Sequence, residues 1–227
     1  YNVSFGTLSL KNNTTGKGNV GIGVGALKEN TIGNENTAVG NAALRETNGT
    51  FNTALGMGAL ANLGSTDDGD GGANTAIGSF AGGDLLKGER NIFIGYNVQG
   101  PISDTESDQL NIGNWIFGKN GQIAIGNFTD LPTAFTNSSE YQLIVKNGIR
   151  TEKVRVDLSS AHNWADYVFA KDYSVMPDYD LEKYIKTNGH LPNIPKAEEV
   201  VKEGIDLGAM DAKLLEKIEE LTLHTIE

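Results

Sequence analysis

The sequence has no cysteine among its 227 residues, which excludes disulfide bonds and thiolate metal sites. It also has no apolar run near the ~18 residues of a spanning helix, which argues against an integral helical membrane protein. Positive charge is scarce, because 18 Lys and Arg stand against 29 Asp and Glu and the formal net charge is −11. This acidic balance argues against binding to a phosphate backbone. We therefore expect neither nucleic acid binding nor membrane insertion.

Glycine, in contrast, is abundant: the chain has 29, nearly twice the roughly 7% of an ordinary domain. The glycines follow no G-X-Y period, so a collagen helix is excluded. Their distribution is uneven, with 25 before residue 141 and 4 after it. The two parts of the chain therefore differ in architecture, and we expect two or three domains.

A short motif recurs along the glycine-rich part. Its copies are NVSFG (2–6), NVGIG (19–23), NTAVG (36–40), NTALG (52–56), NTAIG (74–78), NIFIG (91–95), QLNIG (109–113) and QIAIG (122–126). The intervals between the closing glycines are 17, 17, 16, 22, 17, 18 and 13 residues. Such a period indicates a repeat architecture rather than an ordinary globular domain.

Each position of the motif has a physical interpretation. Apolar or β-branched residues flank a usually small middle residue, which predicts a short strand and the close approach of another backbone at the middle. The closing glycine suits a corner with positive φ. The leading asparagine can bond its own turn and stack in register with the asparagines of adjacent coils. A period near 17 fits one coil of a β-solenoid, with two short strands and two turns, and eight copies predict eight coils.

The core of such a coil is thin, so we expect lateral association between chains. The N-x-A-I-G-x-x-A-L repeat over residues 1–126 resembles the head of trimeric autotransporter adhesins and the related repeats of phage and phage-like tail fibres. This resemblance, not the period, implies a homotrimer. The sequence departs from the repeat at the long fourth interval, around 65–72, and in the last two copies.

The segment after the repeats has a different character. Residues 127–140 have no period and are interpreted as a connector. Alternating residues over 142–146 and 154–158 flank Asn147-Gly148, a strong turn signal, so we expect a β-hairpin. Residues 127–158 are thus predicted to be a linker and β-hairpin connector.

Residues 159–227 are predicted to be α-helical. Asp180 is a plausible N-cap for a helix over 181–186, with Gly189 just after its end. Two prolines make 191–195 extended, a second helix fits 196–203, and the last begins near Leu207.

The last helix carries an apolar stripe, with Met210 and Leu215 alongside. The stripe comprises Leu207, Leu214, Ile218, Leu221 and Thr225. The spacing suits either a parallel coiled coil or an amphipathic helix on a core.

Residues 159–227 resemble the C-terminal region of tail-fibre-domain proteins common in Bacteroidetes. The resemblance is carried by the segments DYVF (166–169), LEKYI (181–185), GHLPNIP (189–195) and KLLEKIEELTL (213–223). More distantly, the layout is similar to the intramolecular chaperone at the end of phage tail spikes. Many of those chaperones trimerise a β-fibre and then cut themselves off with a serine near the domain start. Ser159 and Ser160 lie near that place, but the usual Ser-Asp start and basic run are missing, which puts self-cleavage in doubt.

Other chemical motifs are weak. Gly21–Ala26 matches the dinucleotide fingerprint G-x-G-x-x-A, but the repeat already accounts for its glycines. Asp67, Asp68 and Asp70 fail the spacing of a calcium loop. The three histidines, His162, His190 and His224, have no metal spacing, and His190 is expected to cap a turn or pack. We assign no catalytic, cofactor-binding or metal-binding residue and expect no cofactor and no enzymatic activity.

The sequence therefore predicts a mainly β fold: a trimeric β-solenoid rod over 1–126, a β connector over 127–158, and an α-helical C-terminal trimerisation module over 159–227. The expected function is that of an adhesive fibre, the homotrimeric tail fibre of a phage or an extracellular contractile injection system. Its expected partner is a receptor or glycan on the target-cell surface. The start at Tyr1 suggests a fragment or processed chain, whose missing N-terminal part would join a baseplate or carrier particle.

Three alternatives remain open. A cell-surface trimeric adhesin has the same fold on another carrier. A self-cleaving chaperone or glycan-degrading tail spike would be an enzyme. Ice binding ranks low, because Thr37, Thr53 and Thr75 stand singly on their strands.

Overall fold

The computed structural model describes residues 1–64, 71–128, 135, 141–157 and 164–226. The chain forms two compact units, Tyr1–Ile149 and Arg150–Glu227. The second unit thus begins before residue 159, where the sequence places the start of the helical module.

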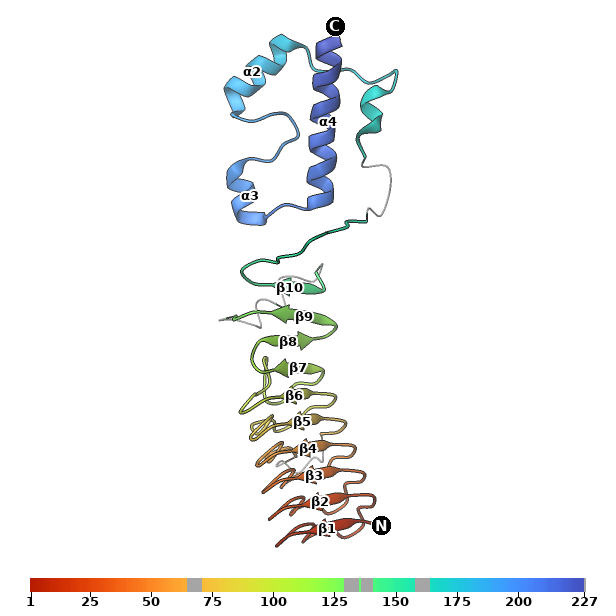
Figure 1. Cartoon of the computed structure of the whole chain (residues 1–227), viewed down its shortest axis with the longest axis vertical. Coiled ribbons are helices and arrows are strands. Elements are labelled where there is room, and N and C mark those ends of the chain that lie inside the picture. Colours follow the sequence, from red (N-terminus) through yellow and green to blue (C-terminus); the bar gives the residue numbers. More distant parts are fainter. Residues whose placement is uncertain (65–70, 129–134, 136–140, 158–163, 227) are drawn as a thin grey trace. The chain divides into compact units, whose positions relative to one another are not determined.

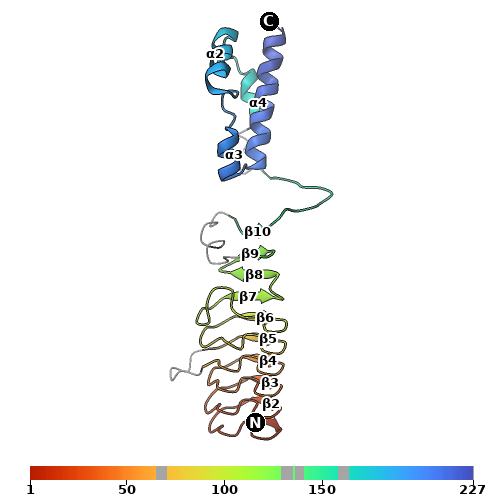
Figure 2. The ribbon, with the colours of Figure 1, turned by 90° about the vertical axis from the view of Figure 1, so that its left-hand side faces the viewer.

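The first unit is a β-solenoid whose strands form one ten-stranded sheet in chain order (Figures 1 and 2). The strands are β1 Val3–Phe5, β2 Val20–Ile22, β3 Thr37–Val39, β4 Thr53–Leu55, β5 Thr75–Ile77, β6 Ile92–Ile94, β7 Gln109–Ile112, β8 Ile116–Lys119, β9 Gln122–Ile125 and β10 Leu143–Val145. Strands β1 to β7 pair in parallel, with equivalent motif positions side by side. Each of these coils contributes one strand rather than the expected two, and turns and bends make up the rest of the coil.

The closing glycines form the predicted corners. All eight have positive φ, from 61° at Gly113 to 142° at Gly40. The corners also stack tightly: a Cβ atom on Gly40 would lie 2.4 Å from the carbonyl oxygen of Gly56. Glycine is therefore required twice at these positions, by the backbone conformation and by the neighbouring coil.

The leading asparagines form the predicted ladder through the solenoid. The backbone N–H of Asn52 donates to Oδ1 of Asn36 at 3.0 Å, and the N–H of Asn74 donates to Oδ1 of Asn52 at the same distance. The Asn52 side-chain amide also donates to the Gly71 carbonyl at 2.9 Å, in the turn that leads into the next strand, rather than to its own turn as predicted. These side chains are fully buried, and their polar groups are satisfied by hydrogen bonds to the adjacent coils.

The core of the solenoid lies between the strands and the segment after each corner. The middle strand residue points inward: Ala38, Ala54 and Ala76 are fully buried. The large side chain that fills the core opposite this small residue is a leucine four residues after the corner glycine. Examples are Leu44 and Leu60, both with φ near 50°. Burial of these leucines offsets the cost of a left-handed backbone that a leucine rarely adopts.

One coil reverses this arrangement of large and small residues. Phe93 stands in β6 where β1 to β5 have a small residue, and Gly82 stands where the earlier coils have leucine. A Cβ atom on Gly82 would lie 2.5 Å from Cδ2 of Phe93, so the ring fills the space of the missing leucine. The two positions therefore compensate each other in volume.

This compensation predicts strong coupling between the two positions. Phe93→Ala alone should cost about 3–5 kcal/mol of unfolding free energy through the cavity left beside Gly82. Gly82→Leu alone should also destabilise, by overpacking. The double variant restores the Leu–Ala pairing of the neighbouring coils and should recover most of the loss in urea unfolding. Additive losses would contradict the account.

The end of the solenoid differs from the prediction. β8 pairs antiparallel with both β7 and β9, so the last 13-residue interval forms a meander instead of an eighth coil. β10 pairs in parallel with β9, and described residues 150–157 form no strand, so the predicted hairpin is wrong. Phe135, from the predicted connector, packs with Phe117 and Ala124 in a second buried cluster.

The described residues of the second unit form a short 3-10 helix and three α-helices. They are η2 Ala165–Phe169, α2 Asp178–Asn188, α3 Ala197–Glu203 and α4 Leu207–Ile226. α2 begins before the predicted N-cap Asp180, because the Pro177 carbonyl accepts the N–H groups of Asp180 and Leu181 at 2.9 Å. It ends at Gly189, as predicted, with φ 75°. Residues 191–194 form a turn rather than an extended stretch, with Asn193 at φ 64°.

Candidate interaction surfaces

The outer face of the sheet is a strip of exposed apolar side chains. The first and third residues of each strand point outward, opposite to the buried middle residue, and Leu55 and Ile77 are 48% and 40% exposed. Exposed side chains of the strip are Val3, Phe5, Ile22, Leu55, Ile77, Ile92, Ile125 and Leu143. Ten strands about 4.8 Å apart make the strip roughly 40 Å long. An apolar face of this extent marks an interaction surface.

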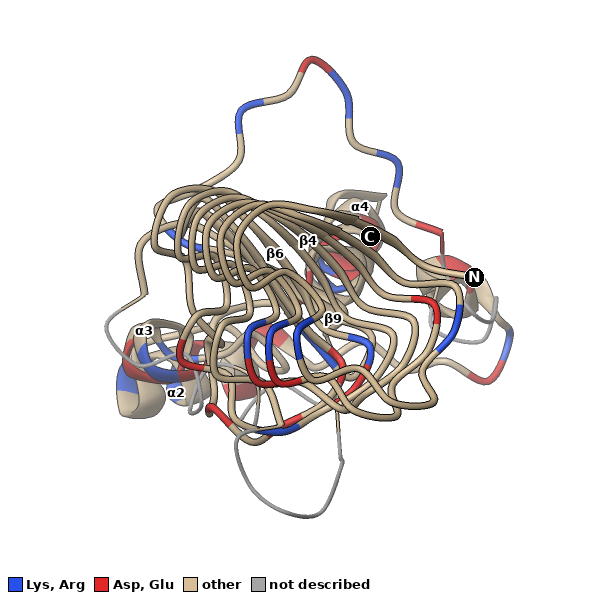
Figure 3. Ribbon diagram, turned by 90° about the horizontal axis from the view of Figure 1, so that it is seen from below, with Lys and Arg blue, Asp and Glu red and all other residues tan. Residues whose placement is uncertain are grey.

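This strip is almost without charge. Of the ten strands, only β8 contains a charged residue, Lys119. Figure 3 shows the Lys, Arg, Asp and Glu positions gathered mostly on the loops of the coils. The solenoid therefore has an apolar wall and charged turns, so it is amphipathic.

The second unit exposes the apolar stripe of its last helix. Leu207, Leu214, Ile218 and Leu221 are between 46% and 64% exposed, whereas Ala212 on the opposite side is buried. The exposed positions alternate in steps of four and three once Asp211 is included, which is a heptad pattern. The stripe thus does not pack on the core of its own chain, contrary to one of the two predicted uses.

A polar network fixes which side of α4 faces its own chain. Buried Glu216 accepts hydrogen bonds from the Tyr167 hydroxyl of η2 and from Asn193 at 3.2 Å, and it pairs with Lys217 at 2.7 Å. Lys217 also pairs with Glu220 at 2.7 Å, and Glu220 accepts a bond from Tyr173. Burial alone would raise the pKa of Glu216, but the bonds from Lys217, Tyr167 and Asn193 hold it below the ordinary 4.5.

The lowered pKa of Glu216 predicts acid sensitivity of the second unit. Its stabilisation is fully present above the ordinary pKa of 4.5 and is lost as the pH falls through the lower folded value. The bond to Glu216, with burial, raises the pKa of Tyr167 to about 12, so the tyrosine contribution is lost at alkaline pH instead. Glu216→Gln should lower the free energy of unfolding of the second unit by about 2 kcal/mol at neutral pH. It should also reduce the loss of helix stability at acid pH, measured by thermal melting followed by circular dichroism. If the variant loses as much helix stability at acid pH as the wild type, this assignment is wrong.

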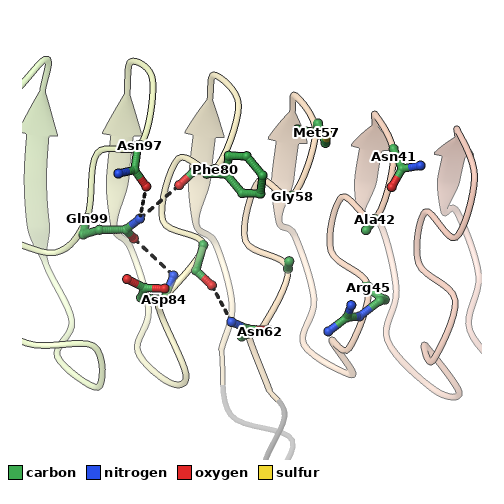
Figure 4. Close-up of a pocket in the computed structure, with 12 residues that line it drawn as sticks. Asn41, Ala42, Arg45, Met57, Gly58, Asn62, Phe80, Asp84, Asn97 and Gln99 are labelled. Carbon is green, nitrogen blue, oxygen red and sulfur yellow. Dashed lines mark hydrogen bonds between the residues drawn. The ribbon is translucent and has the colours of Figure 1, made fainter.

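A groove of about 400 Å³ runs along the solenoid beside the corner segments, lined by residues from four coils (Figure 4). None of its lining residues belongs to a strand, so the groove is separate from the apolar strip. Phe80 forms its apolar part, with Met57 beside it, and Asn62, Asp84 and Arg45 contribute polar groups. The volume falls in the range of small-molecule sites, about 300–1,000 Å³.

Two features build this groove. A Cβ atom on Gly58 would lie 2.7 Å from Cδ1 of Phe80, so the missing side chain gives the ring its place over the adjacent coil. Gln99 then fixes the far side, as Figure 4 shows: its Oε1 accepts the Asp84 N–H at 3.1 Å, and its Nε2 donates to the Phe80 carbonyl at 3.1 Å. No sequence motif marks this groove; its signal is the small Ala61 and Gly83 at positions where earlier coils have Lys or Arg.

The residues of the weak sequence motifs that the structure describes lie at sites that show no chemical role. Gly21–Ala26 lies in β2 and its corner, and no helix follows it. His190 bonds the Leu191 carbonyl at 2.9 Å and packs edge-on against Tyr184, a turn and packing role. The Nδ1 atom of His224 in α4 lies 3.1 Å from the Oδ1 atom of Asp178 in α2. Asp67, Asp68, Asp70, Ser159, Ser160 and His162 lie outside the described residues.

Two features are absent from the residues that the structure describes. No three His, Asp or Glu side chains there gather as a metal site would require. No helix in that part of the chain is long and apolar enough to cross a membrane.

Comparison of the chain with known protein-family models, curated proteins and solved structures gives no match. The fold is therefore established from the structure itself: a β-solenoid followed by a helical unit.

Proposed function

We propose that the protein is a structural, adhesive fibre that works as a homotrimer. The observation that carries this proposal is the apolar strip on the outer sheet face. A single chain leaves Leu55, Ile77 and their equivalents in water along the whole stack. Burial of one such side chain contributes about 1.5–3 kcal/mol, so association along the strip is strongly favoured.

The second unit supports the same association. Neither α2 nor α3 buries a residue, and the apolar stripe of α4 is exposed. The buried apolar residues of this unit, among those the structure describes, are Ala165, Val168 and Ala212. A core this small is insufficient for a unit of its length, so partner copies would supply the remaining burial.

The number three comes from the resemblance of the repeats to trimeric heads, and it fits the preference of identical chains for closed symmetry. As in a tail fibre, the solenoid would present its loops to a cell surface. Three copies would multiply weak contacts, because binding by one copy raises the effective concentration of the others. The carrier in this proposal is a phage tail or an extracellular contractile injection particle.

Two experiments test this proposal. Fluorescently labelled protein should bind cells from a bacterial panel, and a variant reduced to single chains should bind the same cells about a hundredfold more weakly. Immunogold labelling should place the protein on the distal fibres of particles. Label on the producing cell's surface would favour the adhesin alternative, and label confined to the cytoplasm with no cell binding would contradict an adhesive function.

A further inference from the structure

We propose that the groove beside Phe80 binds a neutral hexopyranose unit of a cell-surface glycan. The inference rests on the proposed adhesive function and assigns it a site. It is carried by three observations: a gap in a column of basic residues, an aromatic ring held at a strained position, and polar groups left free for a ligand.

The gap in the column of basic residues lies where equivalent positions of successive coils stack on one another. The fifth residue after the corner glycine is Lys11, Lys28 and Arg45 in the first three coils. It is then Ala61 and Gly83 in the next two. Adjacent coils are bonded at this point, for example by the Glu29 N–H to the Arg45 carbonyl at 2.8 Å. The column of long side chains therefore stops at Arg45 and leaves an open space about two coils, or ~10 Å, in length.

Phe80 gives this space an apolar floor. Its φ is 58°, at a position that other coils fill with Leu8, Gly25, Ala42, Gly58 or Asn97. A left-handed backbone is costly for a bulky residue, yet the ring is still 40% exposed. The phenylalanine therefore gains less from burial than the core leucines do, and a ligand that covers the ring would supply the burial that it lacks. Strain of this kind gathers at binding sites.

The polar groups beside the ring are available to a ligand. Asn62 lines the groove and uses its Nδ2 to donate to the Gly83 carbonyl at 2.8 Å, a bond that does not involve its Oδ1. Neither this oxygen nor the Asp84 carboxylate accepts a hydrogen bond from the residues that the structure describes. Arg45 donates from Nε and Nη2 to Glu46, and its Nη1 has no acceptor among the residues that the structure describes.

This arrangement matches a pyranose ring. A pyranose has a face of C–H groups, which packs on an aromatic ring, and an edge of hydroxyls, which donate to carboxylate and amide oxygens. The free acceptors suit hydroxyl donors, and Asp84 together with the net charge of −11 disfavours an anionic sugar. The ligand class is therefore a neutral hexopyranoside.

Saturation-transfer NMR and calorimetry with the methyl glycosides of glucose, galactose and mannose test the site on the full chain. At least one glycoside should bind, and Phe80→Ala and Asp84→Asn should each weaken binding about tenfold. Both variants introduce residues that other coils already carry at these positions, Ala42 and Asn62, so folding should be retained. Ala61→Arg extends the basic column into the groove and should abolish binding.

The control is Phe51→Ala, which removes another exposed phenylalanine with positive φ that does not line the groove. It should leave glycoside binding unchanged. Absence of binding to all three glycosides, or binding unaffected by both Phe80→Ala and Ala61→Arg, would overturn the site. Cell binding is measured in parallel: if the wild type binds cells under either result, the adhesive function stands and only the groove assignment fails. If the wild type binds no cells, the adhesive function fails whatever the glycosides show.

Discussion

Gly40→Ala should abolish cooperative folding of the solenoid or destabilise it by about 4 kcal/mol or more. The new Cβ atom would lie 2.4 Å from the Gly56 carbonyl oxygen and 2.5 Å from its carbon, and both are backbone atoms. Neither can move without breaking the parallel pairing of β3 and β4. The φ of 142° is also unfavourable for any residue with a side chain.

Gly25→Ala is the matched control for this prediction. Gly25 also has positive φ, 66°, but an added Cβ atom would meet nothing within 4 Å. Its replacement should cost only about 1–2 kcal/mol, the strain of a left-handed alanine. Urea unfolding followed by circular dichroism measures both. Equal losses for the two variants would mean that coil stacking does not determine the requirement for glycine.

Leu55→Glu combined with Ile77→Glu should convert the assembly into single chains. Both side chains point outward from the strip, so the substitution leaves the core of each coil intact. In an assembly, the same substitution would bury several like charges together, at a cost of several kcal/mol for each charge. The expected result is a threefold fall in solution mass with an unchanged far-ultraviolet circular dichroism spectrum.

A double glutamate variant at Phe51 and Tyr96 is the control. These residues are 60% and 76% exposed but lie off the strands, and they also exchange two apolar side chains for charges. The mass of this variant should stay that of the assembly. If it dissociates equally, net charge rather than the strip governs association, and the assignment of the interface is wrong.

The sequence was sufficient to predict the corners and the ladder, because both depend on chemistry local to the motif. Only glycine suits a corner such as Gly40, and the short side-chain amide of Asn52 bonds both the preceding coil and the following coil. It was not sufficient to predict which side of the strand is inside. Alternation along a strand shows that its two faces differ, but it does not show which face is buried. The large core side chains are leucines such as Leu44, which lie outside the strands in a left-handed conformation that leucine disfavours.

The predicted hairpin failed for a related reason. Asn147 and Gly148 do adopt positive φ, 72° and 103°, so the local turn signal was correct. The strand before the turn, β10, pairs with β9 in the growing stack instead of with the residues that follow. An exposed sheet edge offers more partners than a two-strand ribbon, and an isolated hairpin is only marginally stable. The groove was missed because it depends on which residues become neighbours across coils.

The mass of the unmodified chain in solution tests the central claim most directly. Native mass spectrometry and light scattering at micromolar concentration should give three times the chain mass of 24.2 kDa, without single chains. A stable species of 24.2 kDa under these conditions would mean that the apolar strip and the α4 stripe stay in water, which would contradict the fibre proposed here.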